Sequence, residues 1–537
     1  MSFLWVGSQI PLYLYGSVLL DIYSEIGGAN GRYVWMVIGY LIPNAALCPF
    51  VGALSDLFGR KMVAAFGLVL LIVGPVVVST ANTINVAIGG MVIAGLGAGL
   101  NELIALAGTS EMVPIPKRAS YVGGVVFTIL PFCPSPLWAQ LITKDSNWRY
   151  VGALIGAWNA AGLLLVAFCY KDPVILEKPK AREILSKVDY IGGLLSIGGI
   201  TTFMMGLQWG ARQYSWSDPH VLAPLIIGVV LIVAFFLWEL FGAKHPMVPP
   251  ALFSKDKRTM ILILLTTFFS GANFFVVLLF WPTEVYNLYG NDPVQIGIRA
   301  LPIGFGIVGG AVISLVLIGL TKGRTKYLMI FWTCSMTAFT GSMSVANTQN
   351  LTPTVYPLIT FAAISVGAVI IPCSIIAQII CPTELIGTVT AITLSIRYVG
   401  GAVGFTAFYN VFFHKFETMS ATVAGPAIAG QGVSKDYFEL ISLITLASNA
   451  QFEQLMELIQ TSPTVMRKDQ AYGIIVDAVQ KAFAKAYQWP YYISIAFGGA
   501  RSDIAKAVRE PRGPDSPAPE RPPSKELTEP VDGSEKI

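Results

Sequence analysis

Runs of about twenty apolar residues recur along most of this chain, and they constrain its fold more than any other feature. A helix needs about 20 such residues to cross the roughly 30 Å of hydrocarbon in a bilayer. Helices are also the only open-chain structures that satisfy their own backbone hydrogen bonds in lipid. The sequence therefore predicts an all-α, polytopic membrane protein with thirteen full transmembrane helices, at residues 2–20, 33–54, 62–80, 85–107, 119–142, 150–170, 188–209, 221–242, 259–283, 296–320, 326–346, 354–380 and 386–412.

The composition supports a lipid environment. Hydrophobic residues make up 54% of the 537 residues and charged residues only 12%, whereas soluble domains carry about 25% charged residues. A soluble protein of this length would have to hide more apolar surface than its volume allows. The net charge is +4, and no basic face indicates a nucleic-acid partner. Lipid is therefore the expected solvent for most of the chain, and we expect a monomer.

Residues with metal-binding or catalytic chemistry are scattered. The six cysteines lie within or beside apolar runs, and their spacing matches neither a metal site nor a disulfide framework. The three histidines are far apart, at the edges of segments. Residues 1–20 lack the positive start and cleavage site of a signal peptide, so they read as a first span. We expect no metal, no cofactor, no catalytic residue and no enzymatic activity.

Lysine and arginine predict the orientation, because cytoplasmic loops carry more of them than outer loops. Alternate loops are rich in these residues, which places the N-terminus in the cytoplasm. The plasma membrane is the expected location, with a vacuolar or other internal membrane as the alternative. The rich loops contain Arg60, Lys61, Lys117, Arg118, the basic residues of 171–187, Lys244, Lys255, Lys257, Arg258, Lys322, Arg324 and Lys326.

The C-terminal part departs from this regular pattern. A fourteenth apolar run begins at Trp489 and stops after about a dozen residues at Arg501, which is too short to cross a bilayer. Either a natural truncation or a faulty gene structure would explain the break. The predicted divisions are 1–170, an N-terminal six-helix half; 171–258, a cytoplasmic linker with two extra spans; 259–412, spans nine to thirteen; 413–488, an outside loop with helical periodicity at 437–460 and 467–487; 489–500, a partial span; and 501–537, a disordered tail rich in Pro and charge.

A ten-residue motif lies between the second and third spans, from Gly52 to Lys61, and reads GALSDLFGRK. Gly52 would let another helix approach closely, and Gly59 would permit a tight turn. Asp56 could accept hydrogen bonds from a neighbouring helix and pair with Arg60. Arg60 and Lys61 would otherwise be ordinary cytoplasmic charges. The motif resembles the G-x-L-x-D-x-x-G-R-K signature of the major facilitator superfamily, where it acts at the cytoplasmic gate.

A degenerate echo of the motif, GLTKGR, occupies residues 319–324 and lacks the acidic residue. Its place fits two six-helix halves separated by two extra spans. Stretches 8–15, 95–103 and 397–404 resemble the fungal trichothecene-efflux-pump family, a neighbour of the siderophore–iron transporters. That resemblance implies proton-driven export of toxins or other secondary metabolites. The chain departs from the drug–proton antiporter pattern at Met91, in the proline run 131–136, and in lacking an acidic residue near Gln9.

Polar side chains inside predicted spans are expensive and are therefore functional candidates. Glu102 in the fourth span is the candidate for proton coupling, because burial disfavours a charged carboxylate. A structural carboxylate bonded to a neighbouring helix is the equally weighted alternative. Arg397 in the thirteenth span is either a structural ion pair or a substrate contact. The substrate-cavity candidates are Gln9, Asn101, Gln208 and Arg397.

Two further groups of residues complete the predicted site. Small residues let helices approach closely, so we expect close packing at Gly95, Gly97, Gly99, Gly400, Gly401 and Gly404. Aromatic side chains could offer a flat apolar ligand a stacking surface, although at span ends they also form interfacial belts. These are Trp209, Phe274, Phe275, Trp281 and Tyr398.

Three functional hypotheses follow from these features. The first is a secondary transporter that exports a toxin or other secondary metabolite in exchange for protons. The second is a siderophore–iron uptake transporter on the same fold. The third is a non-transporting membrane sensor or an inactive truncated product. An ATP-driven pump is not expected, because the sequence has no phosphate-binding Gly-rich loop that ends in Lys-Ser or Lys-Thr.

Overall fold

The computed structural model describes most of the chain as helix. The described residues are 1–27, 32–170, 188–210, 214–253, 256–290, 292–321, 325–382, 385–433, 436–448, 452–463, 465–466 and 468–507. Within these ranges the structure contains helices and no β-strand, apart from an isolated bridge between Gly210 and Tyr214. The linker 171–187 and the tail beyond residue 507 lie outside the described residues.

The N-terminal half contains the first six predicted spans. Its elements are α1 (Ser2–Ser17), α2 (Leu19–Ile26), α3 (Val34–Phe58), α4 (Arg60–Ser79), α5 (Ile84–Met112), α6 (Ile115–Phe127), η1 (Leu130–Phe132), α7 (Ser135–Asp145), η2 (Trp148–Tyr150) and α8 (Val151–Cys169). The two extra spans are α10 (Tyr190–Trp209) and α11 (Pro219–Leu237), which continues into η3 (Trp238–Gly242).

The C-terminal half begins after η4 (Pro250–Phe253). It contains α12 (Lys257–Phe275), η5 (Val276–Phe280), α13 (Trp281–Tyr289), α14 (Pro293–Leu320), α15 (Thr325–Ser342), η6 (Met343–Val345), η7 (Leu351–Val355), α16 (Tyr356–Ile380) and α17 (Ile386–Met419). The last elements are η9 (Ser420–Ala424), α18 (Gly425–Gly430), α19 (Tyr437–Ser448), α20 (Phe452–Thr461) and α21 (Lys468–Ala507).

The described helices confirm an all-α membrane protein. Eleven of them are long and apolar enough to cross a bilayer, or twelve if the pair α1 and α2, bent by 60°, forms one span. The predicted span at 119–142 is not one continuous helix, because it breaks between α6 and α7 around Pro131 and Pro134. Proline lacks a backbone N–H and its ring clashes with the preceding turn, which interrupts a helix.

Helix α21 differs most from expectation. It begins at Lys468, not at Trp489, so the helical periodicity expected at 467–487 and the partial span expected at 489–500 belong to one continuous helix. Its buried side chains recur every three or four residues, which is the pattern of an amphipathic helix. They include Ala471, Ile475, Ala478, Val479, Ala482, Phe483, Ala486, Tyr487 and Tyr491. The polar residues between them lower the mean hydropathy, so a search for uniformly apolar runs misses this half of the helix.

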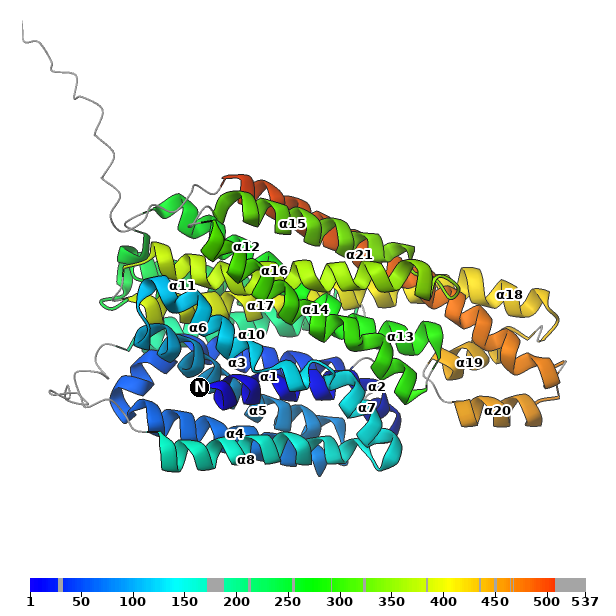
Figure 1. Ribbon diagram of the computed structural model, residues 1–537. Helices are drawn as coiled ribbons and strands as arrows, with labels where there is room; N and C mark the ends of the chain where they lie inside the picture. Colours follow the sequence, from blue (N-terminus) through cyan, green and yellow to red (C-terminus); the bar gives the residue numbers. More distant parts are fainter. Residues whose placement is uncertain are drawn as a thin grey trace, which may run out of the picture.

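The two halves lie side by side, with α1 to α8 on one side and α12 to α17 with α21 on the other (Figure 1). Helix α21 runs along α15 and also packs against α12 and α17. Helices α18, α19 and α20 gather at one end of the molecule, which we call the cap end (Figure 1). In α11 only Val221 and Gly228 are buried, so its apolar surface suits contact with lipid.

Glycines bring the two halves into contact between α7 and α14. A Cβ atom on Gly297 would lie 2.6 Å from Leu137 Cα, and one on Gly304 would lie 2.0 Å from the carbonyl oxygen of Cys133. A side chain at either position would force the helices apart. Helix α17 makes the other junction, against α3 and α5.

Candidate functional site

Glu102 and Arg397 meet in the junction between the halves. Glu102 lies on α5 and is 0% exposed, and Arg397 lies on α17 and is buried. A guanidinium nitrogen of Arg397 forms a salt bridge with Glu102 Oε1, and the Tyr398 hydroxyl donates a hydrogen bond to Oε2. Both carboxylate oxygens therefore receive a donor from the opposite half of the protein.

Helix α17 holds this cluster because its backbone fits closely against α12. A Cβ on Gly271 of α12 would lie 2.2 Å from the carbonyl oxygen of Arg397, and one on Gly400 would lie 2.1 Å from that of Phe268. The Arg397 guanidinium also lies over the Tyr398 ring, 4.9 Å from its centroid, which is within the roughly 6 Å of a cation–π contact. Two consecutive residues of α17 thus present a guanidinium and a phenol to one carboxylate.

A second contact reinforces the junction. The Ser395 hydroxyl of α17 donates a hydrogen bond of 2.7 Å to the carbonyl oxygen of Ala45 in α3. Ser395, Arg397 and Tyr398 lie nearer to the start of α17 at Ile386 than to its end at Met419. These contacts therefore close the two halves together on the side of the cluster that faces away from the cap end.

A small cavity adjoins the cluster, with Gln9, Tyr13, Arg397 and Tyr398 among its lining residues. The Tyr13 hydroxyl donates to Gln9 Oε1 at 3.2 Å, and Gln9 Nε2 donates to the Ser8 hydroxyl at 3.2 Å. The cavity volume is about 60 Å³, whereas pockets for drug-sized ligands measure roughly 300–1,000 Å³. In this conformation it has room for water and not for an organic substrate.

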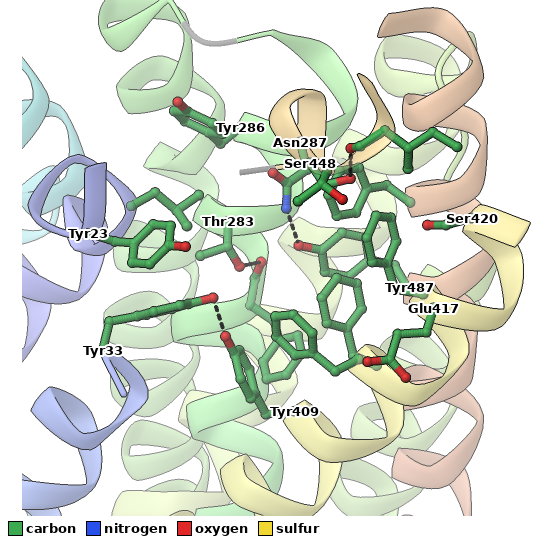
Figure 2. A pocket seen from close by; sticks show the side chains of 18 of the residues that line it. Tyr23, Tyr33, Thr283, Tyr286, Asn287, Tyr409, Glu417, Ser420, Ser448 and Tyr487 are labelled. Carbon is green, nitrogen blue, oxygen red and sulfur yellow. Dashed lines mark hydrogen bonds between the residues drawn. The ribbon is translucent and has the colours of Figure 1, made fainter. Parts of the chain in front are cut away.

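A much larger cavity, of about 620 Å³, lies toward the cap end, where residues of α18 and α19 are part of its lining. We call it the aromatic cavity, because many aromatic side chains from both halves line it (Figure 2). Its volume falls within the usual range for ligand pockets. The rings belong to Tyr23, Tyr33, Phe280, Tyr286, Phe405, Tyr409, Phe412, Phe413, Phe416, Phe483 and Tyr487.

A few polar groups interrupt the aromatic walls. Asn287 Nδ2 donates to the Tyr487 hydroxyl at 2.8 Å, and the Tyr409 hydroxyl donates to that of Tyr33 (Figure 2). The described lining residues include one carboxylate, Glu417, and neither lysine nor arginine. Apolar pockets with a few placed polar groups bind organic molecules by shape, and this lining suits neutral or cationic molecules better than anions.

One wall of the aromatic cavity comes from outside the predicted spans. Helix α19 contributes the lining residues Leu440, Ile441, Ile444, Thr445 and Ser448. Its Leu443 and Ala447 are also buried in the hydrophobic core, so α19 is packed onto the bundle. The segment 413–488, expected to lie outside the membrane, therefore contributes part of the cavity wall.

The facilitator motif occupies the turn between α3 and α4. Gly59 has a φ of +86°, a conformation that glycine adopts without strain. Lys61 Nζ donates to the carbonyl oxygen of Ala167 at 2.7 Å, which ties α4 to the C-terminal turn of α8. Arg60 Nη1 lies 4.0 Å from the position of a Cβ on Gly108 in α5. The side chain of Asp56 lies outside the described residues.

Gly52 does not fit its expected role in this conformation. Around a Cβ placed there, no heavy atom of the described residues lies within 4 Å. The close helix approach expected at Gly52 is therefore not seen here. By contrast, Gly95 approaches α3, since its Cβ would lie 2.4 Å from the carbonyl oxygen of Tyr40, and the corresponding distance from Gly97 to Gly67 O is 2.6 Å.

Three more predicted packing glycines have near neighbours. A Cβ on Gly99 would lie 3.1 Å from the carbonyl oxygen of Asn44, a tight contact with α3. Those on Gly401 and Gly404 would lie 2.0 Å from the Phe275 ring and 2.4 Å from Ala272 Cβ. Helix α17 therefore lies against α12 along its glycine face.

Two substrate-cavity candidates lie elsewhere. Asn101 points toward α4, where a Cβ on Gly67 would meet its amide at 2.8 Å, and it lines neither cavity. With its amide turned, Asn101 donates to Ala64 O and accepts from Leu68 N, both at 3.0 Å. Gln208 is buried, and it also lines neither cavity. Residues 101 and 102 point in different directions because successive side chains on a helix do.

The predicted stacking residues divide in the same way. Phe274, Phe275 and Tyr398 line the small cavity. Trp281 and Trp209 line neither cavity, and the Trp281 indole donates to the carbonyl oxygen of Arg299 at 2.9 Å. No group of three His, Cys, Asp or Glu side chains able to hold a metal occurs in the part of the chain that the structure describes.

Sequence reasoning missed the residues of the aromatic cavity. Tyr33, Asn287, Tyr409 and Tyr487 lie at or beyond the ends of predicted spans, where aromatic side chains are normally assigned to the membrane interface. The run of Phe405, Tyr409, Phe412, Phe413 and Phe416, spaced three or four residues apart, is the one signal in the sequence that marks a continuous aromatic face on a helix.

Comparison with known proteins now defines the family. A profile of the family described as "Fungal trichothecene efflux pump (TRI12)" matches residues 6–509. The chain belongs to this family. Trichothecene efflux pump TRI12 of Fusarium sporotrichioides is 24% identical over 508 residues, which are 92% of this chain and 82% of that protein. Multidrug resistance protein 3 of Bacillus subtilis is 26% identical over 77% of this chain and 79% of its own length.

Solved structures of other transporters share the fold of this member of the efflux-pump family. A bacterial homologue of the human lysosomal transporter Spinster superposes with a TM-score of 0.52 at 13% identity, over 95% of this chain and 96% of that one. The xylose transporter XylE from E. coli gives a TM-score of 0.51 at 12% identity, over 93% and 97% of the two chains. These likenesses confirm the major facilitator fold, and the protein is a multi-pass membrane transporter.

Proposed function

We propose that this chain exports apolar organic molecules, such as toxins or other secondary metabolites, in exchange for protons. One observation carries the proposal. The buried Glu102–Arg397–Tyr398 cluster joins the two halves on one side, while the 620 Å³ aromatic cavity lies between the same halves toward the cap end. This is the arrangement expected of a transporter held open on one side only.

The basic loops support the direction of this opening. Because they indicate a cytoplasmic N-terminus, the cap end would face the outside, and the cluster would close the cytoplasmic side. The conformation is then outward-facing, with the aromatic cavity as the route by which substrate leaves. The plasma membrane is the proposed location, since export of a toxin to the outside requires it.

Glu102 is the proposed coupling residue. In the outward-facing state a proton that reaches Glu102 removes its negative charge and weakens its bond to Arg397. The halves can then separate on the cytoplasmic side, where substrate enters and the proton leaves. Return to the outward-facing state restores the salt bridge. Arg397 and Tyr398 thus bind both carboxylate oxygens until a proton competes with them.

The family relatives are efflux transporters, which does not favour siderophore uptake. The aromatic cavity also argues against a sensor without transport, because a 620 Å³ pocket between two movable halves suits passage of a ligand. The decisive experiment expresses the chain in yeast cells that lack their own drug pumps. We expect tolerance to a panel of fungal toxins, including a trichothecene, to rise several-fold.

The control is the Glu102→Gln variant, confirmed at the cell surface. It should lose most of the tolerance gained. The opposite outcome concerns the unaltered chain. If it gave no more tolerance to any compound than cells without it, and restored growth on a ferric siderophore in cells unable to take that siderophore up, uptake would replace export as the proposed function.

A further inference from the structure

A second buried carboxyl group lies in the C-terminal half, outside the cluster described above. Glu284 belongs to α13, in the continuous helical segment Lys257–Tyr289 that is long and apolar enough to span the membrane. It is 0% exposed. The sequence analysis did not single it out, and the proposed coupling step does not use it.

The surroundings of Glu284 differ from those of Glu102. The Tyr491 hydroxyl of α21 donates a hydrogen bond to Glu284 Oε2. Oε1 is buried without a hydrogen-bond partner, and no salt bridge among the described residues includes this carboxylate. The Arg299 guanidinium of α14 instead bonds to the carbonyl oxygen of Tyr289 at 3.0 Å and lies over its ring.

The groups that face Glu284 are therefore phenols and not cations. They are Tyr487 and Tyr491 of α21 and Tyr289 of α13, with Arg299 already engaged by Tyr289. Burying an ionised carboxylate without a cation costs far more than burying the neutral acid. Glu284 consequently suits its protonated form in this conformation, whereas Glu102 has a cation, Arg397, bonded to it.

We propose that Glu284 is a second proton-binding site of this transporter, occupied in the outward-facing state and linked to the aromatic cavity through α21. Its transport role rests on the function proposed above, but its protonation does not.

The link runs along a polar seam between α13 and α21. Asn287, one turn after Glu284, donates to Tyr487, one turn before Tyr491, at 2.8 Å. Thr283, Asn287 and Tyr487 line the aromatic cavity on one side of the seam, and Glu284 and Tyr491 lie buried beside it. A substrate that displaces Tyr487 would therefore shift Tyr491, the only described donor to Glu284.

The backbone before Glu284 can accommodate such a shift. A π-helical turn, η5, occupies Val276–Phe280, and Pro282 follows it. π-Helical turns are rare and occur often at functional sites, and proline removes a backbone hydrogen bond. These two features loosen the helix immediately before the carboxyl group, so a small rotation there can change what surrounds Glu284.

Infrared difference spectroscopy of the full-length protein in lipid vesicles tests the protonation directly. At pH 7 the Glu284→Gln variant should lose one carbonyl stretching band of a protonated carboxylic acid. Tyr491→Phe should keep the band and shift it to higher frequency, because the hydrogen bond is gone. Glu417→Gln, at an exposed carboxylate of α17, should change no such band.

An unchanged band in Glu284→Gln, in protein that remains monodisperse in detergent, would overturn the proposal. If that variant does not fold, Glu284→Asp replaces it, and the band should then shift; an unshifted band counts against the proposal equally. For transport, Glu284→Gln should move the pH of half-maximal export by about one unit, a tenfold change in proton concentration. An intact pH profile alongside a lost infrared band would leave Glu284 protonated but remove its role in coupling.

The two proposals fail separately. The infrared result needs no transport, so it holds or fails even if no exported compound is found. Conversely, toxin tolerance that depends on Glu102 but not on Glu284 would retain the exporter and reject the second proton site.

Discussion

At the scale of single residues, the protein depends on charge pairing where water is absent. Glu102 is fully buried, so its charge requires Arg397, and the two come from helices that belong to different halves. Removing one member of a buried pair leaves the other uncompensated, at a cost of about 3–5 kcal/mol. Glu102 and Arg397 are therefore expected to behave as a unit.

A double-mutant cycle measures this coupling. Glu102→Gln and Arg397→Gln should each lower the thermal stability of the purified protein, because each leaves its partner buried and unpaired. The double variant should be less destabilised than the sum of the two, by roughly 1–3 kcal/mol, since neither charge remains. Unfolding is followed by fluorescence in detergent. Strict additivity of the two single effects would mean that the residues do not interact.

Helix-packing glycines give a second prediction at this scale. Gly95→Ala should destabilise the protein by about 1–3 kcal/mol, because the new Cβ would lie 2.4 Å from a backbone oxygen that cannot move alone. Gly89→Ala on the same helix is the matched control, since no described atom lies within 4 Å of its Cβ. Gly95→Ala should have the lower thermal unfolding temperature of the two variants. Equal unfolding temperatures would show that α3 and α5 do not approach closely at Gly95.

At the scale of elements, α19 and α21 are packed onto the helical bundle, although most of their residues lie outside the predicted full spans. Both helices bury apolar side chains against the C-terminal half and both contribute to the aromatic cavity. Their residues are mixed in polarity, because one face meets protein and the other does not. The cavity is therefore built partly from helices that a bilayer alone would not define.

A bulky residue on α19 should narrow the cavity. Ile444→Trp adds ring volume at a buried lining position, so export of large substrates should fall several-fold while small ones are less affected. The readout is toxin tolerance in yeast at equal surface expression. Met456→Trp on α20, where the side chain is 43% exposed, is the control and should leave tolerance unchanged. Equal behaviour of the two variants would remove α19 from the binding surface.

At the scale of the whole molecule, function requires the halves to separate where the cluster now joins them. Ser395 of α17 and Ala45 of α3 mark this contact, since the hydroxyl lies 2.7 Å from the carbonyl oxygen. The rigid halves move about their junction, as in other transporters built from paired repeats. A covalent bond across this contact should therefore stop the transport cycle without unfolding either half.

Cross-linking tests this movement. In a background without the native cysteines, Ala45→Cys with Ser395→Cys should form an internal cross-link, and tolerance should fall to that of cells without the transporter. Reduction should restore activity in vesicles, because only the link blocks the cycle. Either cysteine alone is the control. Full transport by the cross-linked protein would show that this contact does not open.

Sequence by itself determined the solvent, the helical class and the family. Hydropathy is a sum over neighbouring residues, and the facilitator motif from Gly52 to Lys61 is local, so neither needs a structure to be recognised. The sequence also identified Glu102 and Arg397 as candidates, since an ionisable side chain inside an apolar run is costly and therefore requires a functional or structural reason. It could not place Asn101 or Gln208, because a one-residue step along a helix turns a side chain toward a different neighbour.

Only the tertiary structure decided which residues meet. Glu102 and Arg397 are 295 residues apart in the chain, and their contact depends on how closely glycines let α5, α12 and α17 approach. The aromatic cavity, the seam between α13 and α21 and the full length of α21 arise in the same way. Each of these features combines side chains from several helices. The side chains of one helix can form a cavity wall or a buried contact only when packing places another helix opposite them.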